Sequence, residues 1–265
     1  MPHVTATDGC RIYYEVISEG LPCVLIPGLG GESGFWRPLL PYLADTHSVI
    51  LIDHRGAGQS DRPESGYSIP RIADDTFAVI DALGLDTVHL VGHSTGGIVA
   101  QTMALNAPER IASTVLSGTW ARIDLRFRRM FESRIALLQH AGGAAYQKLT
   151  QALGYDAEWM ESRVEALDAE VVAAETKLAD PAIQLARLNM LLEHDVYDRL
   201  PDFACPALVL GAMDDALIPF HGSEQLAERI PNARLAQLSG GHFFPKSYPA
   251  PYAEAVLAFH REIAG

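Results

Sequence analysis

The sequence predicts an α/β fold built on one mostly parallel sheet. Short, continuous apolar runs recur along the chain, as in strands that are buried on both faces of a parallel sheet. Segments with helical spacing separate these runs, and repeated strand–helix units favour right-handed crossovers. The 265 residues are 48% hydrophobic and 20% charged, which is enough apolar material for a large core. We therefore expect one large domain, or one domain that carries an inserted subdomain.

Six of the expected strands lie in the first 120 residues. Segments 4–7 and 11–17 flank Asp8-Gly9, a strong turn signal, and are expected to form a hairpin. The remaining elements of this part are expected as buried strands at 23–27, 48–53, 88–92 and 112–118, and as helices at 36–43, 71–83 and 95–106.

The pattern changes after residue 120, where no buried-strand run appears until residue 203. Helices are expected in this part at 124–140, 144–153, 157–179 and 181–193. Strands resume at 207–212 and 234–239, with helices at 222–230 and 251–263. We therefore expect a sheet domain made of residues 1–119 and 204–265, with a helical cap, residues 120–203, inserted into it.

The strongest chemical signal is the pattern Gly-x-Ser-x-Gly at residues 92–96, where an expected strand runs into an expected helix. The two glycines let the backbone turn sharply, which lifts the hydroxyl of Ser94 clear of the sheet. The helix N-terminus then directs free amides at negative charge that forms there. We predict that Ser94 is a nucleophile.

A nucleophilic serine requires a base that a third group orients. If the chain order is serine, acid, histidine, the base comes late in the sequence. His242 lies in the loop directly after the last expected strand, and we predict that it is the base. We expect His93 to point elsewhere, and four other histidines to be exposed and uninvolved: His47, His54, His221 and His260.

The acid is expected after the strand 207–212, where two adjacent carboxylates, Asp214 and Asp215, are available. Adjacent side chains cannot both face the histidine. One of them should orient His242 and stabilise its charged form, while the other is solvated or caps the turn. An acid after the earlier strand 112–118 is disfavoured, because no acidic residue stands at the end of that strand. The next one, Asp124, lies well beyond it.

With these residues the chain resembles the α/β hydrolases that carry a helical cap, and the resemblance runs from end to end. Residues 92–97 (Gly-His-Ser-Thr-Gly-Gly) resemble the nucleophile elbow of that family, and 240–242 (Gly-Gly-His) its histidine loop. Residues 53–60 (Asp-His-Arg-Gly-Ala-Gly-Gln-Ser) resemble the turn after its fourth strand. The resemblance implies an α/β-hydrolase fold: a mostly parallel eight-stranded sheet, helices on both faces and an inserted helical cap.

The resemblance also bears on the choice of acid. In the family this residue usually lies three positions after a glycine and four before a proline. Here the spacing from Gly211 selects Asp214, whereas the spacing to Pro219 selects Asp215. We choose Asp215, because the proline anchors the segment after the acid, and keep Asp214 as the second choice.

Two backbone amides are needed to stabilise the oxyanion. The resemblance implies Thr95, directly after the nucleophile, and Leu29, which follows Pro-Gly at a place where the family usually has His-Gly. The change to proline costs little, because the amide does the chemistry and the glycines supply the backbone freedom. Asp53 and Arg55 are expected to hold loops beneath the site.

Ser94 as nucleophile predicts acyl transfer to water, with His242 as base and then acid. Residues 127–134, 143–146 and 214–219 resemble the aminoacrylate (carbamate-type) hydrolases of pyrimidine breakdown, to which the 3-oxoadipate enol-lactonases are related. We expect a hydrolase of an ester, enol-lactone or carbamate-type bond, with no metal or organic cofactor implied. Two alternatives stay open: a carbon–carbon bond hydrolase of a dienoic acid, and a non-catalytic ligand receptor on the same fold.

The substrate is expected to be a small molecule. Its pocket is expected to include Trp120, Arg126, Tyr146, Trp159 and Phe243. The cap also holds a basic run at positions 122, 126, 128, 129 and 134. Such arginines usually face solvent, but one inside the cap could bind a substrate carboxylate through two parallel hydrogen bonds.

The composition disfavours several other partners. The chain has 33 acidic and 20 basic residues, a formal charge of −13, which disfavours nucleic acid and anionic membranes. Its three cysteines are far apart in sequence and are expected to be free thiols. The first residues do not combine a basic region with an apolar run, so no signal peptide is expected. No apolar run reaches about 20 residues, and we expect a cytoplasmic monomer or homodimer.

Overall fold

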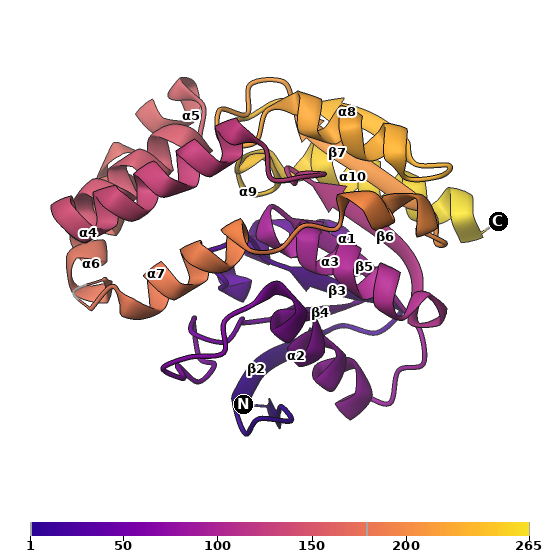
Figure 1. Cartoon of the computed structure of the whole chain (residues 1–265). Coiled ribbons are helices and arrows are strands. Elements are labelled where there is room, and N and C mark those ends of the chain that lie inside the picture. Colours follow the sequence, from indigo (N-terminus) through magenta and orange to yellow (C-terminus); the bar gives the residue numbers. More distant parts are fainter. Residues whose placement is uncertain (1, 179, 265) are drawn as a thin grey trace.

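The computed structural model describes residues 2–178 and 180–264, and its centre is an eight-stranded sheet (Figure 1). The strand order is β1-β2-β4-β3-β5-β6-β7-β8. Strands β1 and β2 pair antiparallel with their neighbours, and the pairs from β4 to β8 are parallel. The prediction of a mostly parallel sheet is confirmed. The strands are β1 His3–Thr5, β2 Arg11–Ile17, β3 Leu21–Ile26, β4 His47–Ile52, β5 Val88–His93, β6 Ile111–Ser117, β7 Ala207–Ala212 and β8 Arg234–Leu238.

The central strands bury side chains on both faces of the sheet. Because successive side chains of a strand point to opposite faces, one strand supplies two separate cores. In β3, Val24 and Ile26 belong to one core, while Cys23 and Leu25 belong to the other. This double burial is why the strands appear in the sequence as continuous apolar runs rather than as alternating ones.

Helices cover both faces, as predicted. The first face is covered by α2 (Ile69–Ala82), α3 (Thr95–Asn106) and α8 (Phe220–Arg229). The second is covered by η1 (Ser33–Leu39), α1 (Leu40–Leu43), α9 (Phe244–Ser247) and α10 (Pro249–Ala264). The helix expected at 36–43 is therefore a 3₁₀ segment followed by one α-helical turn. The short elements α9 and η2 (Pro108–Arg110) have no counterpart in the sequence prediction, because too few residues set their periodicity.

The chain between β6 and β7, which are neighbours in the sheet, is helical. Figure 1 shows α4, α5, α6 and α7 grouped at one side of the sheet, and α4 packs against both α6 and α7. The elements are α4 (Leu125–Gly154), α5 (Ala157–Glu161), α6 (Val164–Lys177), α7 (Ala182–Asn189), η3 (Met190–Leu192) and η4 (Tyr197–Asp202).

The expected helices of this segment differ from the observed ones in detail. The break expected between 140 and 144 is a kink inside α4 at Gly142, where φ is 79° and ψ is −176°. The helix expected at 157–179 is divided into α5 and α6, and its expected last residue, Ala179, lies outside the described residues. The division into a sheet domain, 1–119 and 204–265, and a cap, 120–203, stays a prediction. In the parts of the chain that the structure describes, no helix combines the length and the apolar character needed to cross a bilayer.

The expectation that His47, His54 and His260 are exposed is wrong, since each is at most 3% exposed. His47 Nε2 lies 2.9 Å from His260 Nδ1, and the ring of His89 lies 4.8 Å from that of His260, between centroids. These three rings form a cluster between β4, β5 and α10, in which His47 and His260 are buried and His89 is half-buried. Burial and the neighbouring histidines lower the pKa of His260 to about 3, and mainly burial lowers the pKa of His89 to about 4.

We expect this histidine cluster to make the protein acid-labile. The folded-state pKa of His260 lies below the unfolded value of about 6.5, so the unfolded chain binds more protons below that pH. The stability that neutral His260 contributes is therefore present above pH 6.5. It is lost as the pH falls toward the folded-state pKa. His260 alone should lower the free energy of unfolding by about 2 kcal/mol between pH 6.5 and 5.0. Urea unfolding at pH 7.5 and 5.0 measures this loss.

The His260→Gln variant should lose correspondingly less stability on acidification, whereas His140→Gln, at an exposed position of α4, should behave like the wild type. An equal pH dependence in His260→Gln and the wild type would contradict the assignment of this effect to the cluster.

Candidate active site

Ser94 lies at the sharp turn between β5 and α3, in a strained backbone conformation. Its φ is 53° and its ψ is −118°, and the residue is 6% exposed. A non-glycine residue in such a sparsely populated region costs about 1–3 kcal/mol. Two hydrogen bonds of 2.9 Å hold it there: Ser94 N donates to Ser117 O of β6, and Gly97 N donates to Ser94 O. The geometry is that of a nucleophile elbow, with the serine at its apex.

The two glycines of the Gly-x-Ser-x-Gly pattern are required by close backbone contacts. A Cβ on Gly92 would overlap the carbonyl oxygen of Gly96, and a Cβ on Gly96 would overlap the carbonyl oxygen of Ile26. Strand β3 therefore passes so close to the first turn of α3 that no side chain fits between them. The sequence pattern follows from this packing.

Replacing Gly96 with alanine should therefore destabilise the protein strongly, by more than about 2 kcal/mol, because backbone rather than a flexible side chain would have to move. The control is Gly34→Ala, where no heavy atom of the described residues, apart from the adjoining backbone, lies within 4 Å of the added Cβ. Chemical unfolding of both variants measures the difference. A Gly96→Ala protein as stable as the Gly34→Ala protein would contradict the close packing of β3 on α3.

His242 and Asp215 form a buried pair at the same edge of the sheet. His242 follows β8 and Asp215 follows β7, so both lie beyond the carboxyl ends of parallel strands, as Ser94 does. The distance between His242 Nδ1 and Asp215 Oδ2 is 2.7 Å, and the two residues are 1% and 5% exposed. The other carboxylate oxygen, Oδ1, accepts hydrogen bonds from Leu217 N at 2.9 Å and Ile218 N at 2.7 Å. Since a carboxylate only accepts, Nδ1 donates and Nε2 is left as the acceptor.

Asp214, the second-choice acid, points to the histidine loop rather than to the ring. Its carboxylate accepts hydrogen bonds from Gly240 N at 3.0 and 3.1 Å and from Gly241 N at 3.0 Å. The two adjacent acids therefore make different contacts. Asp215 contacts the ring of His242, and Asp214 holds the backbone of the two glycines that precede His242.

The histidine loop is also attached to the C-terminal end of α4. Phe243 N donates to Gly154 O at 2.7 Å, and a Cβ on Gly154 would overlap the Phe243 ring. Arg126 at the start of α4 donates to the carbonyl oxygens of Ala216 at 2.6 Å and Leu217 at 3.1 Å. One helix of the segment between β6 and β7 therefore supports both the loop of His242 and the loop of Asp215.

The side chain of His93, next to Ser94, packs against the ring of His242. Their ring centroids are 4.8 Å apart, and Phe35 stacks on His93 at 5.0 Å. Burial, with the neighbouring His242, places the pKa of His93 well below its usual value, so the imidazole is neutral. No hydrogen bond joins Ser94 Oγ to His242 within residues 2–178 and 180–264; such bonds are often long before the substrate binds.

Leu29 lies in a turn that faces the serine. Gly31 N donates to Gly28 O at 2.9 Å, which closes the turn over Leu29 without using its amide. A Cβ on Gly28 would lie 3.2 Å from Ser94 Cβ, so this loop passes directly beside Ser94. Thr95 opens α3, and a first-turn amide has no partner inside its own helix. The predicted oxyanion donors are therefore on the two segments that flank Ser94.

The turn after β4 holds the loop of Leu29 through hydrogen bonds. Asp53 accepts hydrogen bonds from Ser33 N at 2.7 Å and Gln59 N at 2.8 Å. Arg55 is fully buried and bonds both oxygens of Asp75 at 2.6 Å, and it also pairs with Asp8. These contacts are structural, as expected.

The five residues expected to line a pocket do not form one group. The ring of Phe243 meets that of Tyr155 at 5.0 Å, and Trp159 stacks on Tyr155 at 4.0 Å. These three rings form an aromatic cluster beside His242, whereas Trp120 packs on Phe127 of α4. Tyr146 is buried among polar groups of α4 and α7, and Arg126 is exposed.

The sequence prediction missed Arg187. This residue of α7 is 2% exposed, and its Nη2 donates to Leu29 O at 2.5 Å. A signal was present: positions 183, 187, 190 and 191 share one helical face, and the other three are Ile183, Met190 and Leu191. A lone arginine on an apolar face indicates burial.

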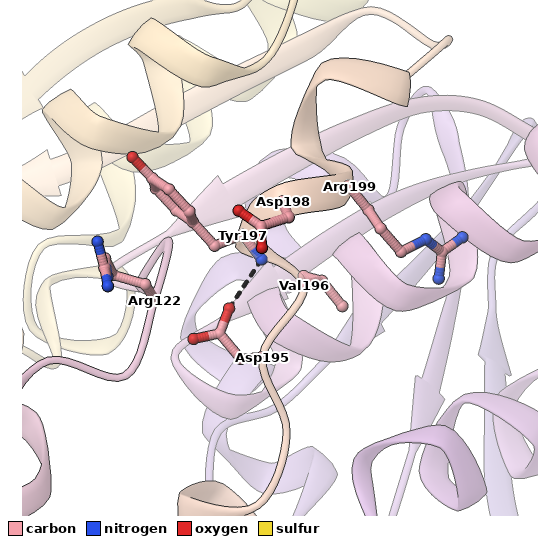
Figure 2. Close-up of a pocket in the computed structure, with 6 residues that line it drawn as sticks. All are labelled: Arg122, Asp195, Val196, Tyr197, Asp198 and Arg199. Carbon is pink, nitrogen blue, oxygen red and sulfur yellow. Dashed lines mark hydrogen bonds between the residues drawn. The ribbon is translucent and has the colours of Figure 1, made fainter.

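A surface hollow of about 250 Å³ lies where the chain leaves and re-enters the sheet (Figure 2). Figure 2 shows Arg122, which follows β6, facing Tyr197 of η4, and the hydrogen bond of 2.8 Å from Tyr197 N to Asp195 Oδ1. Its other lining residues are Val196, Asp198 and Arg199. It contains none of the predicted catalytic residues. No group of three or more histidine, cysteine or acidic residues suited to a metal occurs in the described chain.

Comparisons with known proteins agree with this geometry. Residues 22–246 match a family model described as “alpha/beta hydrolase fold”. The chain is 38% identical, over 99% of both chains, to “Putative carbamate hydrolase RutD” of Azorhizobium caulinodans. Among solved structures, the enol-lactonase of Burkholderia xenovorans LB400 is similar in fold, with a TM-score of 0.89, 22% identity and coverage of 98% and 100%. Est816, described as an N-acyl homoserine lactone degrading enzyme, has a TM-score of 0.80 and 29% identity, with coverage of 97% and 100%.

Proposed function

The chain belongs to the α/β-hydrolase family, and we propose that it is a serine hydrolase that cleaves a carbamate-type bond of a small molecule through an acyl-enzyme at Ser94. The observation that carries the mechanism is the buried hydrogen bond of 2.7 Å between His242 Nδ1 and Asp215 Oδ2, beside the strained elbow. This bond fixes the tautomer in which Nε2 can accept the proton of the serine hydroxyl.

The first half of the reaction forms the acyl-enzyme. Ser94 Oγ attacks the carbonyl carbon while His242 Nε2 takes the hydroxyl proton. The carbonyl oxygen becomes an oxyanion, which the amides of Leu29 and Thr95 stabilise. Collapse of this intermediate breaks the bond to the leaving alcohol or amine, and His242 returns the proton to that group.

The second half repeats these steps with water. His242 removes a proton from water, which attacks the acyl carbon. Ser94 then leaves as the alkoxide, regains the proton from His242 and is ready for another turnover. Throughout, the Asp215 carboxylate stabilises the charged imidazolium without taking its proton.

The substrate class rests on the relatives. RutD of Azorhizobium caulinodans, named for carbamate hydrolysis, covers 99% of this chain at 38% identity. The alignment spans the helical segment, 120–203, which contacts the loops of Asp215 and His242. In our proposal this segment is the cap, and it selects the substrate.

The test compares two substrates with one leaving group, p-nitrophenyl carbamate and p-nitrophenyl acetate, together with an enol-lactone and a dienoic acid. We expect the carbamate to show the largest rate enhancement over its uncatalysed hydrolysis. A larger enhancement with the ester or the lactone would refute the carbamate preference but leave the serine mechanism intact. Cleavage of a carbon–carbon bond in the dienoic acid would support that alternative instead. Absence of any turnover, together with no labelling by a fluorophosphonate, would indicate a receptor.

A further inference from the structure

Two arginines of the helical segment, Arg134 in α4 and Arg187 in α7, are buried without an acidic partner. They are 4% and 2% exposed, and no carboxylate oxygen of the described chain lies within 4.0 Å of either guanidinium nitrogen. Burial of a charge without a counter-charge costs free energy. Arg55 differs from these two arginines. It is fully buried as well, but it is paired with both Asp75 and Asp8, as a buried arginine with a purely structural role would be.

Within the described part of the chain, Arg187 makes hydrogen bonds to neutral groups only. Its Nη2 donates to Leu29 O at 2.5 Å, and its Nη1 lies 3.5 Å from both Gly30 O and Gln184 Oε1. Its Nε is buried and has no hydrogen-bond partner among residues 2–178 and 180–264. Burial lowers the pKa of Arg187 to about 10, so the guanidinium is still positively charged at neutral pH.

Arg134 is connected to Arg187 through a set of polar side chains. Its Nη2 donates to Tyr146 Oη at 2.8 Å and to Thr150 Oγ1 at 3.1 Å, and its Nε also lacks a hydrogen-bond partner in the part of the chain that the structure describes. Gln184 Nε2 lies 3.3 Å from Tyr146 Oη. A chain of contacts therefore runs from Arg134 through Tyr146 and Gln184 to Arg187, with two positive charges and no negative one.

This positive cluster lies next to the proposed oxyanion hole. The carbonyl oxygen that Arg187 holds belongs to Leu29, whose amide is the proposed oxyanion donor. Within one residue these two atoms are no more than about 3.6 Å apart, so Arg187 Nη2 lies within about 6 Å of the amide nitrogen. A carboxylate three bonds from the scissile carbonyl carbon would span a gap of that size.

We propose that Arg187, with Arg134 behind it, is an anion subsite that binds a carboxylate of the substrate. A planar guanidinium recognises a carboxylate through charge-assisted hydrogen bonds. The subsite deepens the proposed function, on which it rests, by restricting the substrates to small acyl compounds with a free carboxylate.

The other role open to Arg187 is to hold the Leu29 loop in place. The two roles differ in what they do to charged and neutral substrates. A loop-holding arginine affects all substrates alike and acts on kcat, whereas an anion subsite acts on the carboxylate substrate alone and mainly on KM.

The test uses two substrates of equal size, acetoxyacetate and acetoxyacetamide, with hydrolysis followed by pH-stat. We expect the wild type to have a higher kcat/KM for acetoxyacetate, and malonate to be a better competitive inhibitor than malonamide. The Arg187→Met variant should lose about 10- to 100-fold in kcat/KM for acetoxyacetate through KM, with little change for the amide. Arg187→Lys should restore part of the loss, and Arg128→Met, at an exposed position of α4, should match the wild type.

Each outcome decides between the two roles. Equal losses with both substrates would show that Arg187 only supports the loop and would overturn the subsite. A wild-type preference for the amide would also overturn it, and this measurement stands even if the methionine variant fails to fold. Hydrolysis of neither substrate, with no fluorophosphonate labelling, would refute the proposed function itself.

Discussion

The Ser94→Ala variant is expected to lose about 10⁴- to 10⁶-fold in kcat, the range found when the nucleophile of a serine triad is removed. The alanine has no hydroxyl to attack the carbonyl, so no acyl-enzyme forms. His242, Asp215 and the backbone donors stay in place, and the small residual rate would come from them. Steady-state kinetics on the preferred p-nitrophenyl substrate measure the loss.

The fold of the Ser94→Ala variant should be unchanged, because the hydrogen bonds that hold this position are made by the backbone of residue 94. Circular dichroism and thermal unfolding check this. Ser133→Ala, at an exposed position of α4, is the matched control and should retain full activity. A Ser94→Ala protein within tenfold of the wild type would remove the serine from the mechanism.

The second large effect is expected for Asp215→Asn, with a loss of about 10⁴-fold in kcat. The asparagine oxygen can still accept from Leu217 N and Ile218 N, which places its NH₂ group opposite His242 Nδ1. An NH₂ group donates, so Nδ1 would have to accept and Nε2 would carry the proton. The histidine could then no longer remove the proton of Ser94.

Asp214→Asn is the control for this variant and should lose less than about tenfold. Among the described residues, its carboxylate receives hydrogen bonds only from the backbone of Gly240 and Gly241, and an amide oxygen can accept from both. The reverse order of the two variants in kcat would show that the acid is Asp214.

The sequence predicts the parts of the site that depend on local backbone geometry. Gly92 and Gly96 mark the elbow because the contacts that require them involve the two adjoining elements and the neighbouring strand β3. His242 and Asp215 could be placed because each follows a strand, and parallel strands present their carboxyl ends at one edge. The sheet and its helical layers follow from the same short-range patterns.

Other features depend on contacts between distant segments, which one sequence does not reveal. Arg187 touches Leu29 only because α7 packs beside the turn after β3. The binding of Asp214 to the histidine loop depends on how the loops after β7 and β8 meet. His47 and His260 were expected at the surface, because histidine is polar, but they cover each other between β4 and α10.

The central claim is that Ser94 becomes covalently acylated during turnover. The most direct measurement is intact-protein mass spectrometry, with peptide mapping, after reaction with p-nitrophenyl N,N-dimethylcarbamate, because dimethylcarbamoyl serines deacylate slowly. We predict one carbamoyl group per chain, on the peptide that contains Ser94, and no adduct in Ser94→Ala. An adduct on another residue, or unmodified protein during measurable turnover, would contradict the proposed mechanism.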